Sequence, residues 1–402
     1  MNRRALLAGA GAAAAMGAGA FVATRRPPAA SWRGEGDCGP ALSRADLDAA
    51  VALGADYLTT AQLPDGTFVY EVDWTTGQRS RDDNVVRQTG ALWGLALLHA
   101  DGLARVEAPL DRALAYWLPR QRSDAGRVWV VDGGARGQTG AMALIGLALV
   151  DRLAAPSAAA LPEAARQSYA EMLDGVLAWV LHARLPAGGF ASAYDPETGV
   201  PGGNPNPYAD GEALLLLVKA ARALQRPELL EQAAGFAVVD HRRNVEVPLL
   251  GEPDPDTTKG YYQWGSMSWW QLAEAGQAPE RHGQWLTELA VWMIDVHRTL
   301  KRTRNTAYAY EGIVSAWDWA HRHGPEDVAR KLACVGQQGL RKLFSWQLGH
   351  PLAPAPLRQA PDAFRGGVQN RADAPPLRID VTQHQTHAAI LARRYGLDTA
   401  SP

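Results

Sequence analysis

The chain has 402 residues, of which 47% are hydrophobic and 20% charged, so it can bury a core large enough for one large domain. Its formal net charge of −2 gives no electrostatic support for nucleic-acid binding, which depends on a strongly basic surface. Two cysteines, Cys38 and Cys334, allow at most one disulfide and cannot supply a thiolate framework for a metal. The sequence alone leaves a disulfide and two free thiols open.

The first thirty residues have the pattern of an export signal. Arg3 and Arg4 precede an apolar, Ala- and Gly-rich run that extends to Ala23, and small residues near its end resemble a cleavage site. Paired arginines are typical of twin-arginine signals, which predicts a periplasmic or extracellular protein. The alternative is an uncleaved membrane anchor, because the run is near the lower length limit for spanning a bilayer.

Apolar residues at the helical period predict twelve helices after this segment. Ser43 followed by Asp46 predicts an N-cap for the first helix, and Gly or Pro lies in most gaps. Short aromatic or β-branched runs at 66–70, 127–131 and 189–194 predict β-hairpins in connections from odd to even helices. The expected helices span residues 43–62, 86–101, 108–121, 137–153, 163–183, 209–223, 227–240, 263–275, 279–302, 305–323, 325–346 and 380–395.

A weak internal repeat supports an architecture of repeated helical hairpins. Residues 62–68 (QLPDGTF) resemble residues 184–190 (RLPAGGF), and each segment is followed by an aspartate and a Thr-Gly pair. The long connections all run from odd to even helices. Insertions therefore gather on one face, where function is usually found.

Every second predicted helix begins with, or is interrupted by, a polar cluster on an otherwise apolar run. If alternate helices line the inside of a ring, all six helix starts meet at one end and form a site. The clusters are residues 81–84 with Arg87 and Gln88; Arg136, Gln138 and Thr139; Tyr208, Asp210 and Glu212; residues 262–264; residues 304–306 with Tyr310 and Glu311; and Arg378, Asp380, Gln383, His384 and His387.

Six helical hairpins, a Pro-Asp-Gly-x-Phe turn at 64–68 and polar starts on the inner helices resemble the (α/α)6 toroid. This architecture is shared by the six-hairpin glycosidases, with related uronate epimerases and lyases, and by the terpenoid cyclase and protein prenyltransferase group. No catalytic signature of a single family matches, so the resemblance implies fold more strongly than chemistry. The expected organisation is all-α, with an export signal at 1–30, a linker at 31–41, a toroid domain at 42–397 and a tail at 398–402.

The terpenoid branch lacks its characteristic motifs. Asp82 and Asp83 are followed by Val86 and Arg87 and lack the last carboxylate of the magnesium motif, and Cys334 has no neighbouring zinc pattern. Asp380, His384 and His387 could share a helix face and hold a metal, but such a set more often binds substrate or core groups. We therefore expect neither a metal nor a cofactor.

The carbohydrate branch fits better, because glycoside hydrolysis needs two carboxyl groups across a cleft, about 5–10 Å apart. Glu311 lies past the capping zone of its helix on an apolar segment, so burial should raise its pKa as a general acid requires. Asp83 is the expected opposing base, and Glu212 and Asp380 are further catalytic candidates. Glu212 has a structural alternative, since a carboxylate there could cap its helix.

Arginines near the inferred open end favour an anionic, uronic-acid-containing glycan, because the guanidinium group matches a carboxylate in bidentate fashion. Pairing with nearby carboxylates would account for part of this set. Two alternatives stay open: a uronate epimerase or lyase using Tyr and His, and a glycan-binding accessory protein of envelope or exopolysaccharide assembly. The expected substrate-binding residues are Asp82, Asn84, Arg87, Gln88, Tyr208, Trp264 (a stacking platform), Arg304, Tyr310, Arg378 and His384.

Overall fold

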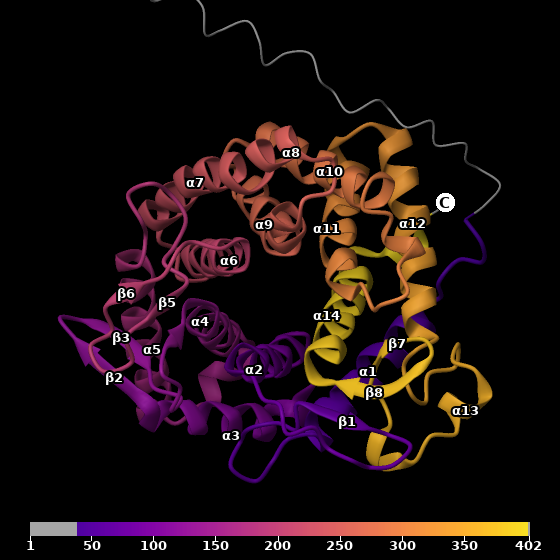
Figure 1. Cartoon of the computed structure of the whole chain (residues 1–402), viewed down its shortest axis with the longest axis horizontal. Coiled ribbons are helices and arrows are strands. Elements are labelled where there is room, and N and C mark those ends of the chain that lie inside the picture. Colours follow the sequence, from indigo (N-terminus) through magenta and orange to yellow (C-terminus); the bar gives the residue numbers. More distant parts are fainter. Residues whose placement is uncertain (1–37, 401–402) are drawn as a thin grey trace, which may run out of the picture. The chain divides into compact units, whose positions relative to one another are not determined.

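The computed structural model describes residues 38–400, and these residues form a ring of six helical hairpins (Figure 1). Neighbouring inner helices contact one another, and the last of them packs against the first, so the ring closes. The inner helices are α2 (Val85–Ala100), α4 (Thr139–Ala154), α6 (Pro207–Ala223), α9 (Asp256–Glu274), α11 (Ala307–His323) and α14 (Ile379–Tyr395). The outer helices are α1 (Arg44–Thr60), α3 (Glu107–Trp117), α5 (Glu163–His182), α7 (Pro227–His241), α10 (Pro279–Asp295) and α12 (Glu326–Phe344).

The expected all-α class and the twelve helices are confirmed, while several short elements were not expected. The helix α9 begins at Asp256, earlier than the expected 263, because its first turns are polar and lack the apolar period. The predicted export signal lies outside the described residues. The additional helical segments are η1 (Ala104–Val106), η2 (Leu118–Arg120), η3 (Pro156–Ala160), the π-helical η4 (Arg242–Glu246), α8 (Val247–Gly251), η5 (Thr299–Lys301), α13 (Ala355–Arg358), η6 (Asp362–Phe364) and η7 (Leu397–Thr399).

The inner helices are buried on nearly every face, whereas the outer helices keep one face in water. In α4, every residue from Thr139 to Arg152 is buried. A helix that is apolar all round is typical of such a position, which explains the Ala- and Leu-rich runs of the sequence. No described helix has the length and apolarity that crossing a membrane requires.

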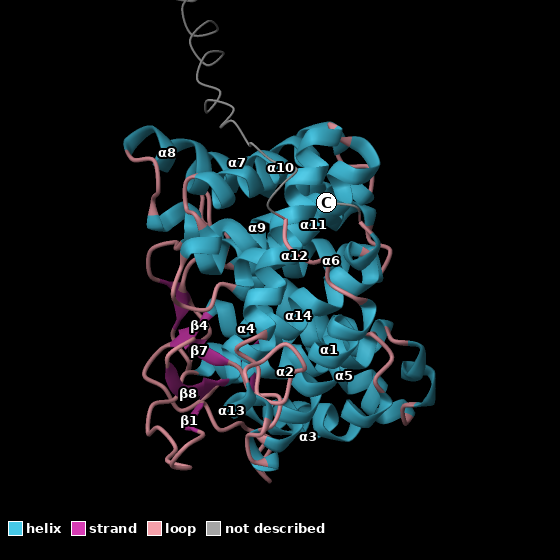
Figure 2. Ribbon diagram, turned by 90° about the vertical axis from the view of Figure 1, so that its right-hand side faces the viewer, coloured by secondary structure: helices cyan, strands magenta, loops and turns pink. Residues whose placement is uncertain are grey.

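The strands all lie in connections that run from an outer helix to the next inner helix, and they gather at one end of the ring (Figure 2). β2 (Gln121–Asp124) and β3 (Arg127–Val130) form the hairpin expected at 127–131, and the run at 189–194 contributes β5 (Ala193–Tyr194), which pairs with the next strand, β6 (Pro201–Gly202). The segment 66–70 is not a strand, since Phe68 makes a single bridge with Gln62. β7 (Gln369–Arg371) and β8 (Ala374–Arg378) form another hairpin. Two pairings join different connections: β4 (Gly137–Gln138) with β5, and β1 (Glu71–Asp73) with β8.

The two copies of the internal repeat share one hydrogen bond, from a phenylalanine amide to a side chain of the next inner helix. The Phe68 amide donates to Gln88 Oε1 at 2.7 Å, and the Phe190 amide donates to Asp210 Oδ1 at the same distance. In both copies a polar side chain of the following inner helix holds the turn that precedes it. Gln88 also donates to the Phe68 carbonyl at 2.8 Å. These contacts give two polar cluster members, Gln88 and Asp210, a structural role.

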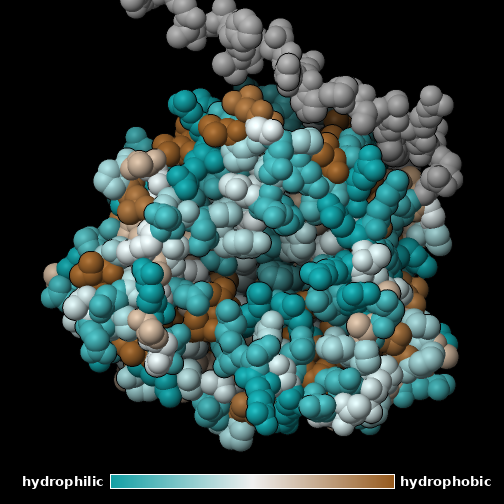
Figure 3. Space-filling model, viewed as in Figure 1, coloured by the Kyte–Doolittle hydropathy of each residue, from teal (hydrophilic) through white to brown (hydrophobic). Residues whose placement is uncertain are grey.

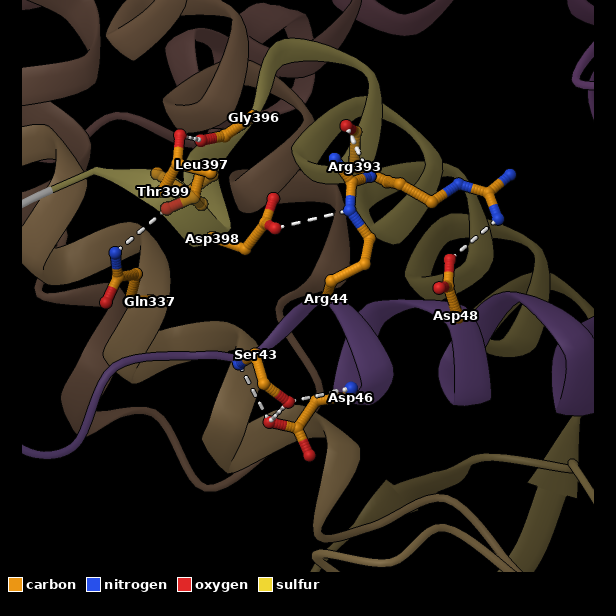
Figure 4. A network of polar contacts seen from close by, with 10 residues as sticks. All are labelled: Ser43, Arg44, Asp46, Asp48, Gln337, Arg393, Gly396, Leu397, Asp398 and Thr399. Atoms are coloured by element: carbon orange, nitrogen blue, oxygen red, sulfur yellow. Dashed lines mark hydrogen bonds and ion pairs between the residues drawn. The ribbon is translucent and has the colours of Figure 1, made fainter.

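The first and last helices join the ends of the ring. Arg44 of α1 forms an ion pair with Asp398 at 3.2 Å, and Arg393 of α14 forms one with Asp48 at 3.0 Å (Figure 4). Gly54 lets the two helices approach closely, because a Cβ there would lie 2.0 Å from the hydroxyl oxygen of Thr386. The first outer helix, α1, is therefore joined to the last inner helix, α14.

The chain before α1 is attached to the body by a disulfide. Cys38 is bonded to Cys334 in α12, across a sequence separation of 296 residues. The capping box expected at the start of α1 is also present, with Ser43 and Asp46 each accepting from the backbone of the other. Of the two alternatives left open by the sequence, the structure has the disulfide.

Replacing Gln88 by Leu should destabilise the fold, because it leaves the Phe68 amide and carbonyl groups buried without partners. The expected loss is about 1–3 kcal/mol of unfolding free energy for each unsatisfied group. Urea denaturation followed by circular dichroism measures it. Gln78→Leu, at an exposed loop position, is the matched control. Equal midpoints for Gln88→Leu and wild type would contradict the structural role of this side chain.

Candidate functional site

A cavity of about 470 Å³ lies at the end of the ring where the strands gather. Figure 3 looks onto this end and shows a recess near the middle of the face, surrounded mainly by hydrophilic residues. All six inner helices or the residues just before them contribute to its wall. The polar lining residues are Asn84, Arg87, Gln138, Ser192, Asn206, Tyr208, Glu212, Lys259, Gln263, Asn305, Tyr308, Asn370, Arg378, Asp380, Gln383 and His384, and Trp264 adds an aromatic wall.

The structure brings together more than half of the residues expected at the site. Those that line the cavity are Asn84, Arg87, Tyr208, Glu212, Trp264, Arg378, Asp380 and His384. Those that do not are Asp82, Asp83, Gln88, Arg304, Tyr310 and Glu311. The residues of the second group do not line the cavity for different reasons.

Asp82 and Asp83 lie in the exposed loop before α2, on the outer side of the helix cap formed by Asn84. Asp83 accepts a hydrogen bond from Gln88 at 2.8 Å, which ties it to the turn rather than to the cavity. Arg304 is exposed, and its backbone pairs with that of Arg371. Asp83 is therefore not among the residues that line the cavity, and nothing in its contacts supports its expected place opposite a general acid.

Tyr310 is fully buried on the side of α11 that faces α12, where a Cβ at Gly339 would lie 1.9 Å from its ring. Its hydroxyl group is buried beside the side chains of Thr299 and Thr306. Consecutive helical residues point about 100° apart, so Tyr310 and Glu311 cannot both face the ring axis. Only Glu311 does.

Glu212 is the buried carboxyl group of the cavity wall. It lies in the second turn of α6, against Gly140 of α4, where a Cβ would lie 2.2 Å from its Oε2. Burial raises its pKa from the ordinary 4.5 to about 8, and the charge of Arg87 offsets only part of this effect. Glu212 is therefore a neutral carboxylic acid at pH 7, as a proton donor must be. It does not cap its helix, since Asn206 does so.

Asp380 is the ionised carboxylate of the same cavity. Arg378 binds it in bidentate fashion at 3.0 and 2.6 Å, and Arg87 Nε lies 3.2 Å from its Oδ2. Burial alone would raise the pKa of Asp380, but the hydrogen bonds and charges of Arg378 and Arg87 lower it below its ordinary value. Two guanidinium groups thus share one carboxylate, which leaves a net positive charge beside Glu212.

Glu311 lies fully buried beneath the cavity between two histidines of α14. His384 Nδ1 is 3.2 Å from Glu311 Oε1, and His387 Nδ1 is 3.0 Å from the same oxygen. Burial would raise the pKa of Glu311, as expected from the sequence, but the charges and hydrogen bonds of His384 and His387 outweigh burial and lower it. The expected raised pKa is therefore wrong, and Glu311 is an ionised partner of two imidazoles.

His384 lines the cavity with its side chain 21% exposed, and Glu311 fixes the orientation of its ring. With Nδ1 directed at Glu311, Nε2 is the nitrogen left to exchange a proton with a ligand. The Trp264 ring meets the His384 ring edge-on at a centroid distance of 6.0 Å. In the described part of the chain, no three His, Cys, Asp or Glu side chains gather as a metal site.

Several lining residues were not chosen from the sequence. Asn206 caps α6, and Asn305 accepts from the Ala307 amide at the start of α11, as Asn84 does for α2. An asparagine just before each of three inner helices is a signal that sequence reasoning could have used. Lys259 could not have been recognised, because it lies on the part of α9 that the apolar period missed.

No protein-family model matches the sequence, and no curated protein matches it either. Solved structures of similar fold include cellobiose 2-epimerase from Spirochaeta thermophila, with 14% identity, a TM-score of 0.61, and coverage of 89% of this chain and 96% of that chain. They also include an unsaturated glucuronyl hydrolase specific for heparin (12%, TM-score 0.58, coverage 89% and 100%). A family 76 α-mannanase from Bacteroides thetaiotaomicron is similar as well (12%, TM-score 0.58, coverage 87% and 96%). These likenesses show that the chain adopts the (α/α)6 toroid.

The raised pKa of Glu212 predicts a pH dependence of stability. Folded Glu212 keeps its proton between pH 4.5 and about 8, where the unfolded chain releases it, so the unfolding free energy falls as pH rises through this window. The slope reaches about 1.4 kcal/mol per pH unit. Glu212→Gln cannot ionise and should lose this contribution. Urea denaturation of both proteins at pH 5 and pH 8 measures the difference, and parallel pH curves would contradict the assignment.

Proposed function

We propose that this protein is a carbohydrate-active enzyme, with glycoside hydrolysis as its reaction and an acidic glycan as its substrate. The observation that carries the proposal is Glu212, a buried carboxyl group that stays protonated at neutral pH and lines an open cavity. The structures of similar fold support it, because they are those of a mannanase, a glucuronyl hydrolase and an epimerase of cellobiose. One of them, an inactive aspartate-to-alanine variant of an α-1,6-mannanase, is in complex with α-1,6-mannotetrose.

Glu212 and His384 supply the two proton transfers of hydrolysis. Glu212 donates its proton to the glycosidic oxygen as the bond from that oxygen to the anomeric carbon breaks. His384 Nε2 accepts a proton from the water that bonds to the same carbon. Glu311 stabilises the imidazolium that results, through the contact of 3.2 Å to Nδ1. The general-acid role first assigned to Glu311 thus passes to Glu212, and the base role passes from Asp83 to His384.

The charge of the cavity supports an acidic sugar. Arg87 and Arg378 share the single charge of Asp380, and each guanidinium keeps N–H groups that a second carboxylate can use. Lys259 is largely neutralised by an ion pair with Asp256. The net positive charge on the Asp380 side would bind a uronate carboxylate and orient the neighbouring glycosidic bond toward Glu212.

Export remains part of this proposal. The twin-arginine pattern at Arg3 and Arg4 motivates it, and the Cys38–Cys334 disulfide supports it, because disulfides persist mainly in oxidising compartments. A periplasmic or extracellular location would also place the enzyme where glycans of the cell envelope are found.

Epimerisation is a second candidate, favoured by the imidazole of His384 with a carboxylate behind it. Such a pair can remove a proton from a carbon next to a carbonyl group, as a 2-epimerase requires. Glu212 would then donate to the carbonyl oxygen. Glycan binding without turnover, as in an accessory protein, is the third reading.

Glu212→Gln should abolish turnover while leaving binding intact, because glutamine keeps the shape and lacks the transferable proton. The screen uses uronic-acid oligosaccharides, heparin fragments, α-1,6-mannan and cellobiose in D₂O. New reducing ends indicate hydrolysis, and deuterium on a sugar carbon indicates epimerisation. A loss of at least about 10²-fold in kcat is expected for a general acid.

Asp83→Asn is the matched control for Glu212→Gln, since it removes a carboxylate outside the cavity. It should leave kcat close to wild type. Binding of a glycan by wild type without any product would favour the accessory reading. Full activity of Glu212→Gln would remove Glu212 from the mechanism.

Arg87→Gln should reduce the preference for acidic over neutral sugars. The variant leaves Asp380 paired with Arg378, so only the spare positive charge is lost. A charged hydrogen bond of about 1.5–3 kcal/mol corresponds to a roughly 10- to 100-fold loss in affinity for an acidic oligosaccharide. Isothermal titration with an acidic sugar and its neutral counterpart measures this loss. An equal change for both sugars would count against a carboxylate-binding role.

A further inference from the structure

A second cavity, of about 250 Å³, lies between the C-terminal halves of the same inner helices. Its charged lining residues are Asp151, Lys219 and Arg394, and His387 also faces it. Lys219 Nζ contacts both carboxylate oxygens of Asp151 at 2.7 and 2.8 Å. The proposed reaction uses none of these groups.

The two cavities share a thin wall of side chains. Trp93 lines the second cavity, and its ring lies 5.7 Å from that of Trp264, which lines the first. His387 packs edge-on against Trp93 at 5.0 Å. Glu311 lies fully buried in this wall, and its Oε2 has no hydrogen-bond partner among the described residues.

One carboxylate oxygen in the wall contacts a histidine of each cavity. Glu311 Oε1 contacts His384 Nδ1, whose ring lines the first cavity, and His387 Nδ1, whose ring lines the second. A single buried carboxylate can neutralise one imidazolium but not two. Protonation of one histidine therefore disfavours protonation of the other.

Charged groups lie on both sides of the two histidines. Burial lowers the pKa of His387; Glu311 raises it, and the positive charges of Lys219 and Arg394 lower it further. The residues of α9 and α11 that line the second cavity carry no charge. On the other side, Asp380 lies close enough to His384 for the two charges to interact, and Arg87 and Arg378 both pair with that carboxylate. The positive charges that line the second cavity thus disfavour the protonated form of His387.

We propose that His387 is a positioning residue that sets the protonation state of His384 through the shared carboxylate of Glu311, so that charge in the second cavity controls the base in the first. The catalytic consequence rests on the proposed role of His384. The coupling itself does not, and it can be measured without a substrate.

Lys219→Met provides the sharpest test, because coupling through Glu311 and direct electrostatics predict shifts of the His384 titration midpoint in opposite directions. Removing a positive charge should by itself favour the protonated form of every nearby histidine. Through Glu311, however, a more readily protonated His387 should make His384 harder to protonate. Imidazole NMR titration of the ¹⁵N-histidine-labelled protein, with signals assigned by loss in His384→Gln and His387→Gln, should show the midpoint of His384 falling and that of His387 rising. The expected shifts are about 0.5–1 pH unit.

His387→Phe tests the same coupling in the other direction. Phenylalanine keeps the ring packed against Trp93 but removes the donor and the titrating group, so Glu311 serves His384 alone. The midpoint of His384 should rise by about 1 pH unit. His387→Gln, which retains an amide donor, should give a smaller rise. Where turnover is found, the acid limb of the kcat/KM profile should move in the same direction.

Lys301→Met is the charge-matched control, at an exposed position that lines neither cavity, and should leave both midpoints unchanged. Melting temperatures establish that each variant is folded. A His384 midpoint that is unchanged in His387→Phe, or that rises in Lys219→Met, overturns the proposal. Either result leaves the test of Glu212 unaffected, so failure here is distinguishable from failure of the proposed function.

Discussion

The closed ring of inner helices is the constraint on which the rest of the molecule depends. A helix that touches two inner neighbours and an outer helix has almost no face left for water, so its middle turns are apolar or small, as in α4. Polar side chains can enter only near the ends. Because all six inner helices begin at the same end, their first turns form one cavity without any further device. Their N-terminal dipoles also point at it, which adds to the positive character given by Arg87 and Arg378.

The loops at this end are fixed by the helices that follow them. Gln88 and Asp210 each bind the backbone of a phenylalanine in the preceding turn. In consequence, the polar residues at a helix start divide into two sets, those that hold the loop and those that face the cavity. Arg87 and Gln88 are neighbours in sequence and belong to different sets.

The sequence predicted the fold well because period, helix caps and repeat all report on local structure. It predicted the site less well, because a periodic pattern does not determine the residue at which a helix begins or the direction in which each side chain points. Asp83 accepts a hydrogen bond from Gln88 in the loop before the Asn84 cap and does not line the cavity. The pKa of Glu311 depends on two histidines of α14, far along the chain, and no local signal indicates whether such partners exist.

Two buried glutamates show how the ring assigns different chemistry to similar positions. Glu212 and Glu311 both lie in the second turn of an inner helix, and burial by itself acts to raise the pKa of both carboxyl groups. Glu212 meets only a distant guanidinium, so the effect of burial prevails and it keeps its proton. Glu311 is held between two imidazoles, so their influence prevails and it gives its proton up. A neutral acid and an ionised carboxylate thus arise on the same scaffold because of what the neighbouring helix carries, which is the division that acid–base catalysis requires.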